Sequence, residues 1–132
     1  MMRDPLMKAI RLALCATTAA MTPTLACASS DGILGSWQRG DGNARVRIES
    51  CGSALCAINI WIRDESGGEH VGDRLVMKVS GDGASMSGAA YDPQRKLNYK
   101  LEINVVSQSM QTRGCVLAGI VCKSINWTRV SR

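Results

Sequence analysis

The stretch Tyr99-Lys100-Leu101-Glu102-Ile103-Asn104-Val105 alternates polar and apolar side chains almost without interruption. Successive side chains of a β-strand point to opposite faces, so a strand with one buried face and one wet face alternates in this way. The same period of two runs through residues 45–49, 57–63 and 74–79. Strands that are buried on one face only are typical of antiparallel sheets. The sequence therefore predicts an all-β protein.

Shorter strand candidates occupy residues 35–39, 85–91, 110–115 and 120–130. Turn-forming residues separate nearly all of the strands, at Gly40-Asp41-Gly42-Asn43, Gly67-Gly68, Gly81-Asp82-Gly83 and Asp92-Pro93. Eight strands spaced roughly ten residues apart predict a meander that closes into a barrel or folds as a sandwich. We expect a single eight-stranded antiparallel up-and-down β-barrel, because closure removes both exposed edges of the sheet.

The inward face of this barrel follows from the alternation. We expect it to carry Trp37, Val46, Ile48, Ile58, Ile60, Ile62, Leu75, Met77, Val79, Leu101, Ile103, Val105, Met110, Ile125 and Trp127. These side chains provide enough apolar volume to fill an eight-stranded interior without a ligand.

Residues 1–28 have the pattern of a secretory signal peptide. Arg3, Lys8 and Arg11 form a positive N-terminal region, and the mainly apolar stretch at 10–21 is too short to span a bilayer. Ala26-Cys27-Ala28 matches the small-x-small cleavage pattern. We expect cleavage after Ala28, which leaves residues 29–132 as one β-barrel domain in the periplasm or outside the cell. The alternative is a lipoprotein that is acylated on Cys27.

Charge and hydropathy exclude two classes of partner. Removal of residues 1–28 takes away three basic residues and one acidic residue, so the net charge falls from +5 to +3. The remaining charges alternate in sign without a basic track, which argues against nucleic acid. No apolar run reaches the roughly 20 residues of a transmembrane helix. We expect a monomer.

Four cysteines remain after cleavage, and four cysteines allow three disulfide connectivities. The spacing favours the local one, because Cys51 and Cys56 bracket one short turn-like stretch and Cys115 and Cys122 bracket another. These spacings are not those of zinc sites, and an exported chain meets an oxidising compartment. We expect two disulfides, no metal and no cofactor.

Several short motifs together resemble an uncharacterised bacterial family, domain of unknown function 2147. They are Gly35-Ser36-Trp37, Cys51-Gly52-Ser53-Ala54-Leu55-Cys56, Tyr91-Asp92-Pro93, Arg113-Gly114-Cys115 and Trp127-Thr128-Arg129-Val130. The resemblance covers nearly all of the chain after the signal peptide. It implies a small exported protein with a lipocalin-like barrel, and it implies nothing about activity. The chain departs from the family's pattern at Ala57, where a glycine is usual, and in a short segment at 64–73.

The lipocalin comparison also implies a device at the base of the barrel. A Gly-x-Trp motif on the first strand, with an arginine on the last, resembles a closure in which a guanidinium covers an indole ring. The partners here would be Trp37 and Arg129, in a cation–π contact that contributes roughly 0.5–2 kcal/mol.

Candidate catalytic residues are sparse. His70 is the single histidine and lies in a polar, glycine-containing stretch, whereas a general base needs a fixed position and a partner. Asp64, Glu65, Glu69 and Asp73 do not have the spacing of a calcium-binding loop. We therefore expect that the protein is not an enzyme. The alternative is a hydrolase with a site built from loops near His70, Asp73 and Asp92.

Three aromatic residues are the candidate binding residues. Tyr91 and Tyr99 flank the Asp92-Pro93 turn, and Trp61 is expected on the outer face of its strand. Tryptophan and tyrosine are enriched at binding hot spots. The sequence thus predicts a binding module for a small apolar ligand at the barrel mouth or for an envelope protein on the outer face. A cavity of at least about 300 Å³ would favour the small ligand.

Overall fold

A computed structural model describes residues 32–132 of the chain. The expected signal peptide at 1–28 and the Cys27 alternative lie outside the described residues. Eight strands and one short 3-10 helix, Glu65–Gly67 (η1), make up most of the structure. The strands are Gly35–Arg39 (β1), Ala44–Cys51 (β2), Ala54–Ile62 (β3), Arg74–Gly81 (β4), Ser85–Asp92 (β5), Leu97–Val106 (β6), Ser109–Val116 (β7) and Val121–Ser131 (β8).

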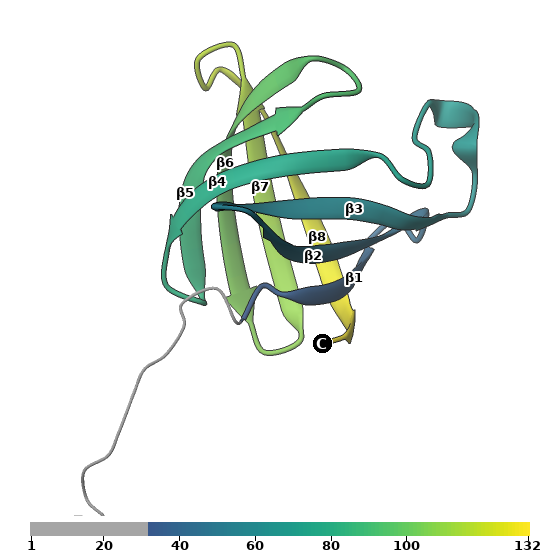
Figure 1. Cartoon of the computed structure of the whole chain (residues 1–132), viewed down its shortest axis with the longest axis horizontal. Coiled ribbons are helices and arrows are strands. Elements are labelled where there is room, and N and C mark those ends of the chain that lie inside the picture. Colours follow the sequence, from purple (N-terminus) through teal and green to yellow (C-terminus); the bar gives the residue numbers. More distant parts are fainter. Residues whose placement is uncertain (1–31) are drawn as a thin grey trace, which may run out of the picture.

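The strands form a closed antiparallel barrel in which each strand pairs with its sequence neighbours and β1 pairs with β8 (Figure 1). This confirms the eight-stranded up-and-down barrel. Up-and-down order places the β1–β2, β3–β4, β5–β6 and β7–β8 connections at one end of the barrel. The other three connections and residues 32–34, which lead into β1, lie at the opposite end. We call these the mouth and the base.

The predicted inward face is correct for most strands and wrong for part of β3. Arg45 pairs with Trp61, but its neighbour Val46 pairs with Asn59, so Ile60 is an extra residue in a β-bulge. A bulge reverses which residues of a strand face inward. Ile62 is buried, as expected, whereas Ile60 is 45% exposed and Ile58 pairs with the outward-facing Arg47.

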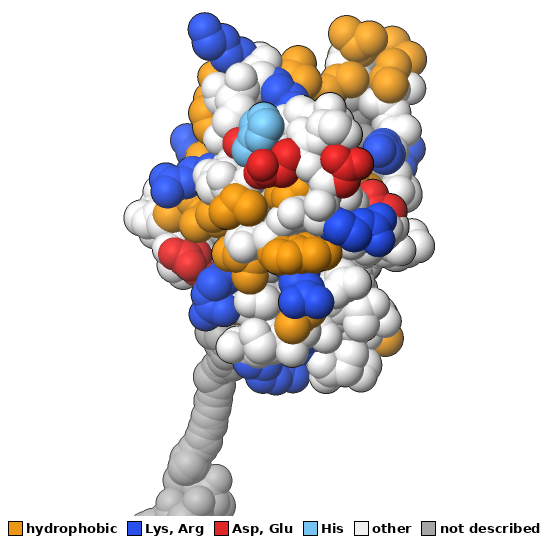
Figure 2. Space-filling view, turned by 90° about the vertical axis from the view of Figure 1, so that its right-hand side faces the viewer, with side chains coloured by type: hydrophobic (Ala, Val, Ile, Leu, Met, Phe, Trp, Pro, Cys, Tyr) orange, Lys and Arg blue, Asp and Glu red, His pale blue; other side chains and the backbone are white. Residues whose placement is uncertain are grey.

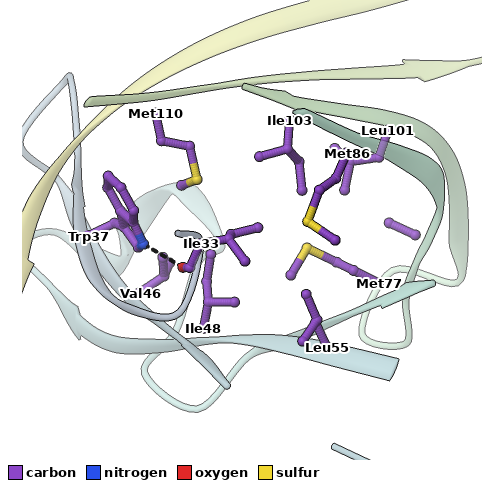
Figure 3. Close-up of a cluster of buried hydrophobic side chains, with 11 residues drawn as sticks. Ile33, Trp37, Val46, Ile48, Leu55, Met77, Met86, Leu101, Ile103 and Met110 are labelled. Carbon is purple, nitrogen blue, oxygen red and sulfur yellow. Dashed lines mark hydrogen bonds between the residues drawn. The ribbon is translucent and has the colours of Figure 1, made fainter. Parts of the chain in front are cut away.

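The base of the barrel is closed by an inward-facing tryptophan and the segment that leads into β1. Trp37 and Ile33 are fully buried, and Trp37 Nε1 donates a hydrogen bond to the Ile33 carbonyl oxygen at 2.9 Å (Figure 3). Arg129 lies over the Trp37 ring with its Cζ atom 4.2 Å from the centroid. Its Nη1 and Nη2 atoms donate to the carbonyl oxygens of Leu34 and Gly32.

Arg129 therefore connects β8, the ring of Trp37 and the incoming chain. Burial lowers the pKa of its guanidinium, with a smaller contribution from the positive charge of Arg132. An arginine stays charged under these conditions because its ordinary pKa is so high. The base is consequently held by a cation whose two terminal nitrogens donate to backbone carbonyl groups, whereas its buried Nε atom has no hydrogen-bond partner among the described residues.

Both disulfides are local, as the cysteine spacing predicted. Cys51 bonds to Cys56 across the β2–β3 hairpin at the base. Cys115 bonds to Cys122 across the β7–β8 hairpin at the mouth, where the two residues are direct partners in the ladder. Each bond thus fixes one end of one hairpin.

Replacement of Cys115 by Ser should lower the free energy of unfolding by about 2 kcal/mol while leaving the fold intact, because a short loop loses little closure entropy. Cys122→Ser removes the same bond and should cost about as much. Urea denaturation of the two variants and the wild type measures the loss. If either variant fails to fold, the bond does more than fix a hairpin end.

Candidate functional site

The interior of the barrel contains a cavity of about 980 Å³ that is open at the mouth. Its deeper wall is apolar and includes Val46, Ile48, Met77, Leu101, Ile103 and Met110. Figure 3 shows these side chains converging from different strands, with the closing pair Trp37 and Ile33 beside them. The volume lies at the upper end of the roughly 300–1,000 Å³ range that is typical of small-molecule sites.

The expectation of a filled interior holds for the base, where a buried cluster packs around Trp37 and Ile33, and is wrong for the part of the barrel toward the mouth. Small inward-facing residues are one reason. Ala57, Ala90 and Gly114 line the cavity at positions where a larger side chain would occupy space. The bulge in β3 is a second reason, because it places Asn59 on the cavity wall and leaves Ile60 outside.

An ion pair across the mouth joins the end of β1 to the β3–β4 loop. Arg39 forms a two-point contact with the Glu69 carboxylate, in which Nη2 donates to Oε2 at 2.7 Å. Its Nε atom also donates to Asp41 Oδ1 at 3.0 Å. The hydrogen bond from Arg39 holds the pKa of Glu69 below its usual value, and the same is true of Asp41. All three residues line the cavity.

A second charged cluster fixes the β5–β6 turn to the same loop. Arg95 Nη1 donates to Asp92 Oδ2 at 2.9 Å, and Arg95 Nη2 donates to the Gly68 carbonyl oxygen at 2.8 Å. Arg95 Nη2 is also 3.7 Å from Asp73 Oδ2. Burial raises the pKa of Asp92, but hydrogen bonds from Arg95 and Gln94 outweigh this effect and hold the pKa below its usual value. The β3–β4 loop is thus tied to the rim on two sides.

The three candidate aromatic residues occupy different surfaces. Tyr99 faces inward and lines the cavity, and a Cβ atom on Gly114 would lie 3.6 Å from its ring. Tyr91 is exposed on the outer face of β5, next to Val76 of β4. Trp61 is exposed on the outer face of β3, and the Arg45 guanidinium lies 5.1 Å from its ring centroid. The structure therefore does not bring the three into one site, and their binding roles stay a prediction.

In the hydrolase alternative, the imidazole of His70 does not contact the carboxylates of Asp73 and Asp92. His70 is exposed in the β3–β4 loop, and its Nδ1 atom lies 3.6 Å from Glu65 Oε2 (Figure 2). Asp73 and Asp92 line the cavity, whereas His70 is not among its lining residues. Asp73 Oδ2 accepts a hydrogen bond from the His70 backbone N–H at 3.1 Å and lies 3.7 Å from Arg95. Neither Asp73 nor Asp92 has a carboxylate oxygen within 4.0 Å of an imidazole nitrogen of His70.

The comparison with known families matches the whole barrel. Residues 35–129 fit the family described as "Uncharacterized protein conserved in bacteria (DUF2147)". The chain belongs to this family. The match runs from the first residue of β1 to Arg129 in β8, so the DUF2147 unit is the barrel itself. Searches of the curated proteins and of the solved structures found no match.

Residues 32–132 of this DUF2147 protein contain neither a candidate metal site nor a candidate membrane-spanning helix. No group of three or more histidine, cysteine, aspartate or glutamate side chains is arranged to hold a metal ion there. In the same part of the chain, no helix has the length and apolar character needed to cross a membrane.

Several cavity residues of this DUF2147 protein were not singled out from the sequence as binding candidates. Lys123 faces inward because it is in phase with Ile125 and Trp127 on β8, and the alternation at residues 120–130 could have revealed this. The inward orientation of Asn59 could not be predicted from the sequence, because it depends on the bulge in β3. Arg39 and Glu69 are 30 residues apart, and no local pattern predicts such a pair.

Proposed function

We propose that this protein is an exported, non-enzymatic binding module that holds a small apolar ligand inside its barrel. The observation that carries the proposal is the cavity of about 980 Å³ with an apolar deeper wall and an opening at the mouth. An apolar molecule that enters a cavity of this kind displaces water from its apolar wall. Burial of apolar surface then drives binding. The cavity favours a ligand over an envelope protein as the partner.

Two further observations support export and a monomeric state. Disulfides are typical of proteins in oxidising compartments, and both cysteine pairs form bonds. A closed barrel leaves no unpaired strand edge for a second copy to extend. The His70 imidazole is exposed and has neither the Asp73 nor the Asp92 carboxylate within 4.0 Å of its nitrogens, which supports binding over hydrolysis.

Adjacent alanines on β5 provide a matched test of the binding site. Ala90 is buried and lines the cavity, whereas Ala89 is exposed on the outer face. Ala90→Phe should place a ring inside the cavity and abolish saturable binding of the uncharged fluorescent probe N-phenyl-1-naphthylamine. Ala89→Phe makes the same exchange outside and should bind the probe like the wild type. Fluorescence titration measures both.

The ring in Ala90→Phe has space to enter, so we expect a folded protein, which urea denaturation checks. Ala57→Phe projects a ring into the cavity from β3 and repeats the test from another strand. If wild-type protein does not bind the probe, or if both cavity variants bind it normally, the proposed site is wrong.

A further inference from the structure

Lys123 is a cation on the cavity wall that forms no ion pair with an acidic residue among residues 32–132. Lys123 pairs with Gly114 in the β7–β8 ladder, in phase with the cavity residues Ile125 and Trp127. In this register its side chain is directed to the inner side of the barrel at the mouth, where Lys123 is exposed to solvent. Within residues 32–132, no carboxylate lies within 4.0 Å of its ammonium group.

The other cationic side chains near the cavity either form ion pairs, point outward or donate to backbone carbonyl groups. Arg39 is paired with Glu69 and Asp41, and Arg95 is paired with Asp92 and Asp73. Arg74 precedes the inward-facing Leu75 and pairs with Ile58 on the outer side of the sheet. At the base, Arg129 is held by carbonyl groups. Lys123 is the remaining cation among the described cavity residues.

The acidic residues at the mouth do not cancel this charge. The four that line the cavity are Asp41, Glu69, Asp73 and Asp92. Each of them is within 4.0 Å of a nitrogen atom of Arg39 or Arg95. These two clusters are ion pairs within the rim, so a ligand that enters beside Lys123 meets one unmatched positive charge.

Tyr99 and Lys123 flank Gly114 from the two strands on either side of β7. The Tyr99 ring lies against Gly114, at 3.6 Å from the position that a Cβ atom would take, and Gly114 is the ladder partner of Lys123. Glycine at position 114 leaves the space between the two side chains open. An ammonium group and a phenol both donate hydrogen bonds, and a charged donor forms a stronger bond with an anion than with a neutral group.

We propose that the ligand is an amphiphile with one anionic head, such as a carboxylate, which Lys123 binds at the mouth while the apolar chain occupies the deeper cavity. This inference rests on the proposed function. The apolar wall formed by Met77, Leu101 and Ile103 takes the chain. The ammonium group of Lys123 takes the head, with the Tyr99 hydroxyl as a second donor.

Competition between chain-matched molecules tests the head group. Dodecanoate, dodecanol and dodecyltrimethylammonium have the same chain and differ in charge, and each displaces N-phenyl-1-naphthylamine if it enters the cavity. At neutral pH, dodecanoate should compete at about tenfold lower concentration than dodecanol, as expected for one charged hydrogen bond. Dodecyltrimethylammonium should compete less well than dodecanol.

Lys123→Met should remove the advantage of dodecanoate and leave dodecanol unchanged, because methionine keeps the apolar stem without the charge. Lys100→Met is the matched control, since Lys100 is exposed on the outer face of β6. This variant loses the same net charge and should keep the full preference for dodecanoate.

The outcomes separate the two proposals. Equal competition by dodecanoate and dodecanol on the wild type would overturn the anionic head while leaving the cavity as the site. A preference that persists in Lys123→Met would overturn the role of this lysine. Failure of the wild type to bind the probe at all would instead overturn the proposed function.

Discussion

Replacement of Trp37 by Ala should lower the free energy of unfolding by about 3–5 kcal/mol, the range for removal of a buried aromatic side chain. Trp37 is fully buried at the base of the barrel, so its truncation leaves a cavity there. The substitution also removes the hydrogen-bond donor of the Ile33 carbonyl and uncovers Arg129. Urea denaturation followed by circular dichroism measures the loss.

Trp61→Ala is the matched control, because it removes the same side chain from the outer face, where Trp61 is 38% exposed. It should cost less than half as much as the substitution at the base. Trp37→Phe keeps most of the packing and loses the hydrogen bond, so its cost should fall between the two. Equal losses for the two alanine variants would show that Trp37 does not close the base.

Replacement of Asp92 by Ala should lower the free energy of unfolding by about 3 kcal/mol, because several hydrogen bonds to one charged group are lost together. Asp92 is 7% exposed. Its Oδ1 atom accepts from the backbone N–H groups of Gln94 and Arg95 and from Gln94 Nε2, and its Oδ2 atom accepts from Arg95 Nη1. The variant frees Arg95, which also holds the β3–β4 loop.

The contribution of Asp92 to the free energy of unfolding should depend on pH. A carboxylate with a depressed pKa stabilises the folded state above its unfolded pKa of about 3.9, and this stability is lost as the pH falls through the lower folded value. Asp92 has such a pKa. The difference in stability between wild type and Asp92→Asn should therefore be constant from pH 5 to neutrality, in line with this linkage, and shrink below about pH 4.

Asp82→Ala provides the control for Asp92. Asp82 accepts two backbone hydrogen bonds in the β4–β5 turn, from Ala84 and Ser85, and no arginine contacts it. Asp82 lies at the base end and does not hold the β3–β4 loop. Its replacement should therefore lower the free energy of unfolding clearly less than Asp92→Ala does. If Asp92→Ala is no more destabilising than Asp82→Ala, the cluster around Arg95 does not fix the rim.

Much of the barrel could be predicted from local patterns. Alternation over residues 99–105 and its weaker counterparts located four of the eight strands, and shorter candidates between the turns located the other four. Glycine- and aspartate-containing turns located most of the strand ends. The pairing of Cys51 with Cys56 and of Cys115 with Cys122 followed from short spacing. These features depend on neighbours along the chain, which is why sequence reasoning reached them.

The candidate site was predicted less well. The three aromatic residues were grouped by composition and by the turn that two of them flank, but only Tyr99 faces the cavity. Lys123 was available from the alternation of β8 and was overlooked. Asn59 was hidden because one extra residue in β3 reverses the inward face.

The sequence by itself determined how many strands form, in which order they pair and which cysteines bond, because each of these depends on residues close together in the chain. Only the tertiary structure decided that the barrel is hollow. Whether an interior is filled depends on how side chains from all eight strands meet across it. Here a bulge in β3 and the small residues Ala57, Ala90 and Gly114 together leave the space toward the mouth open.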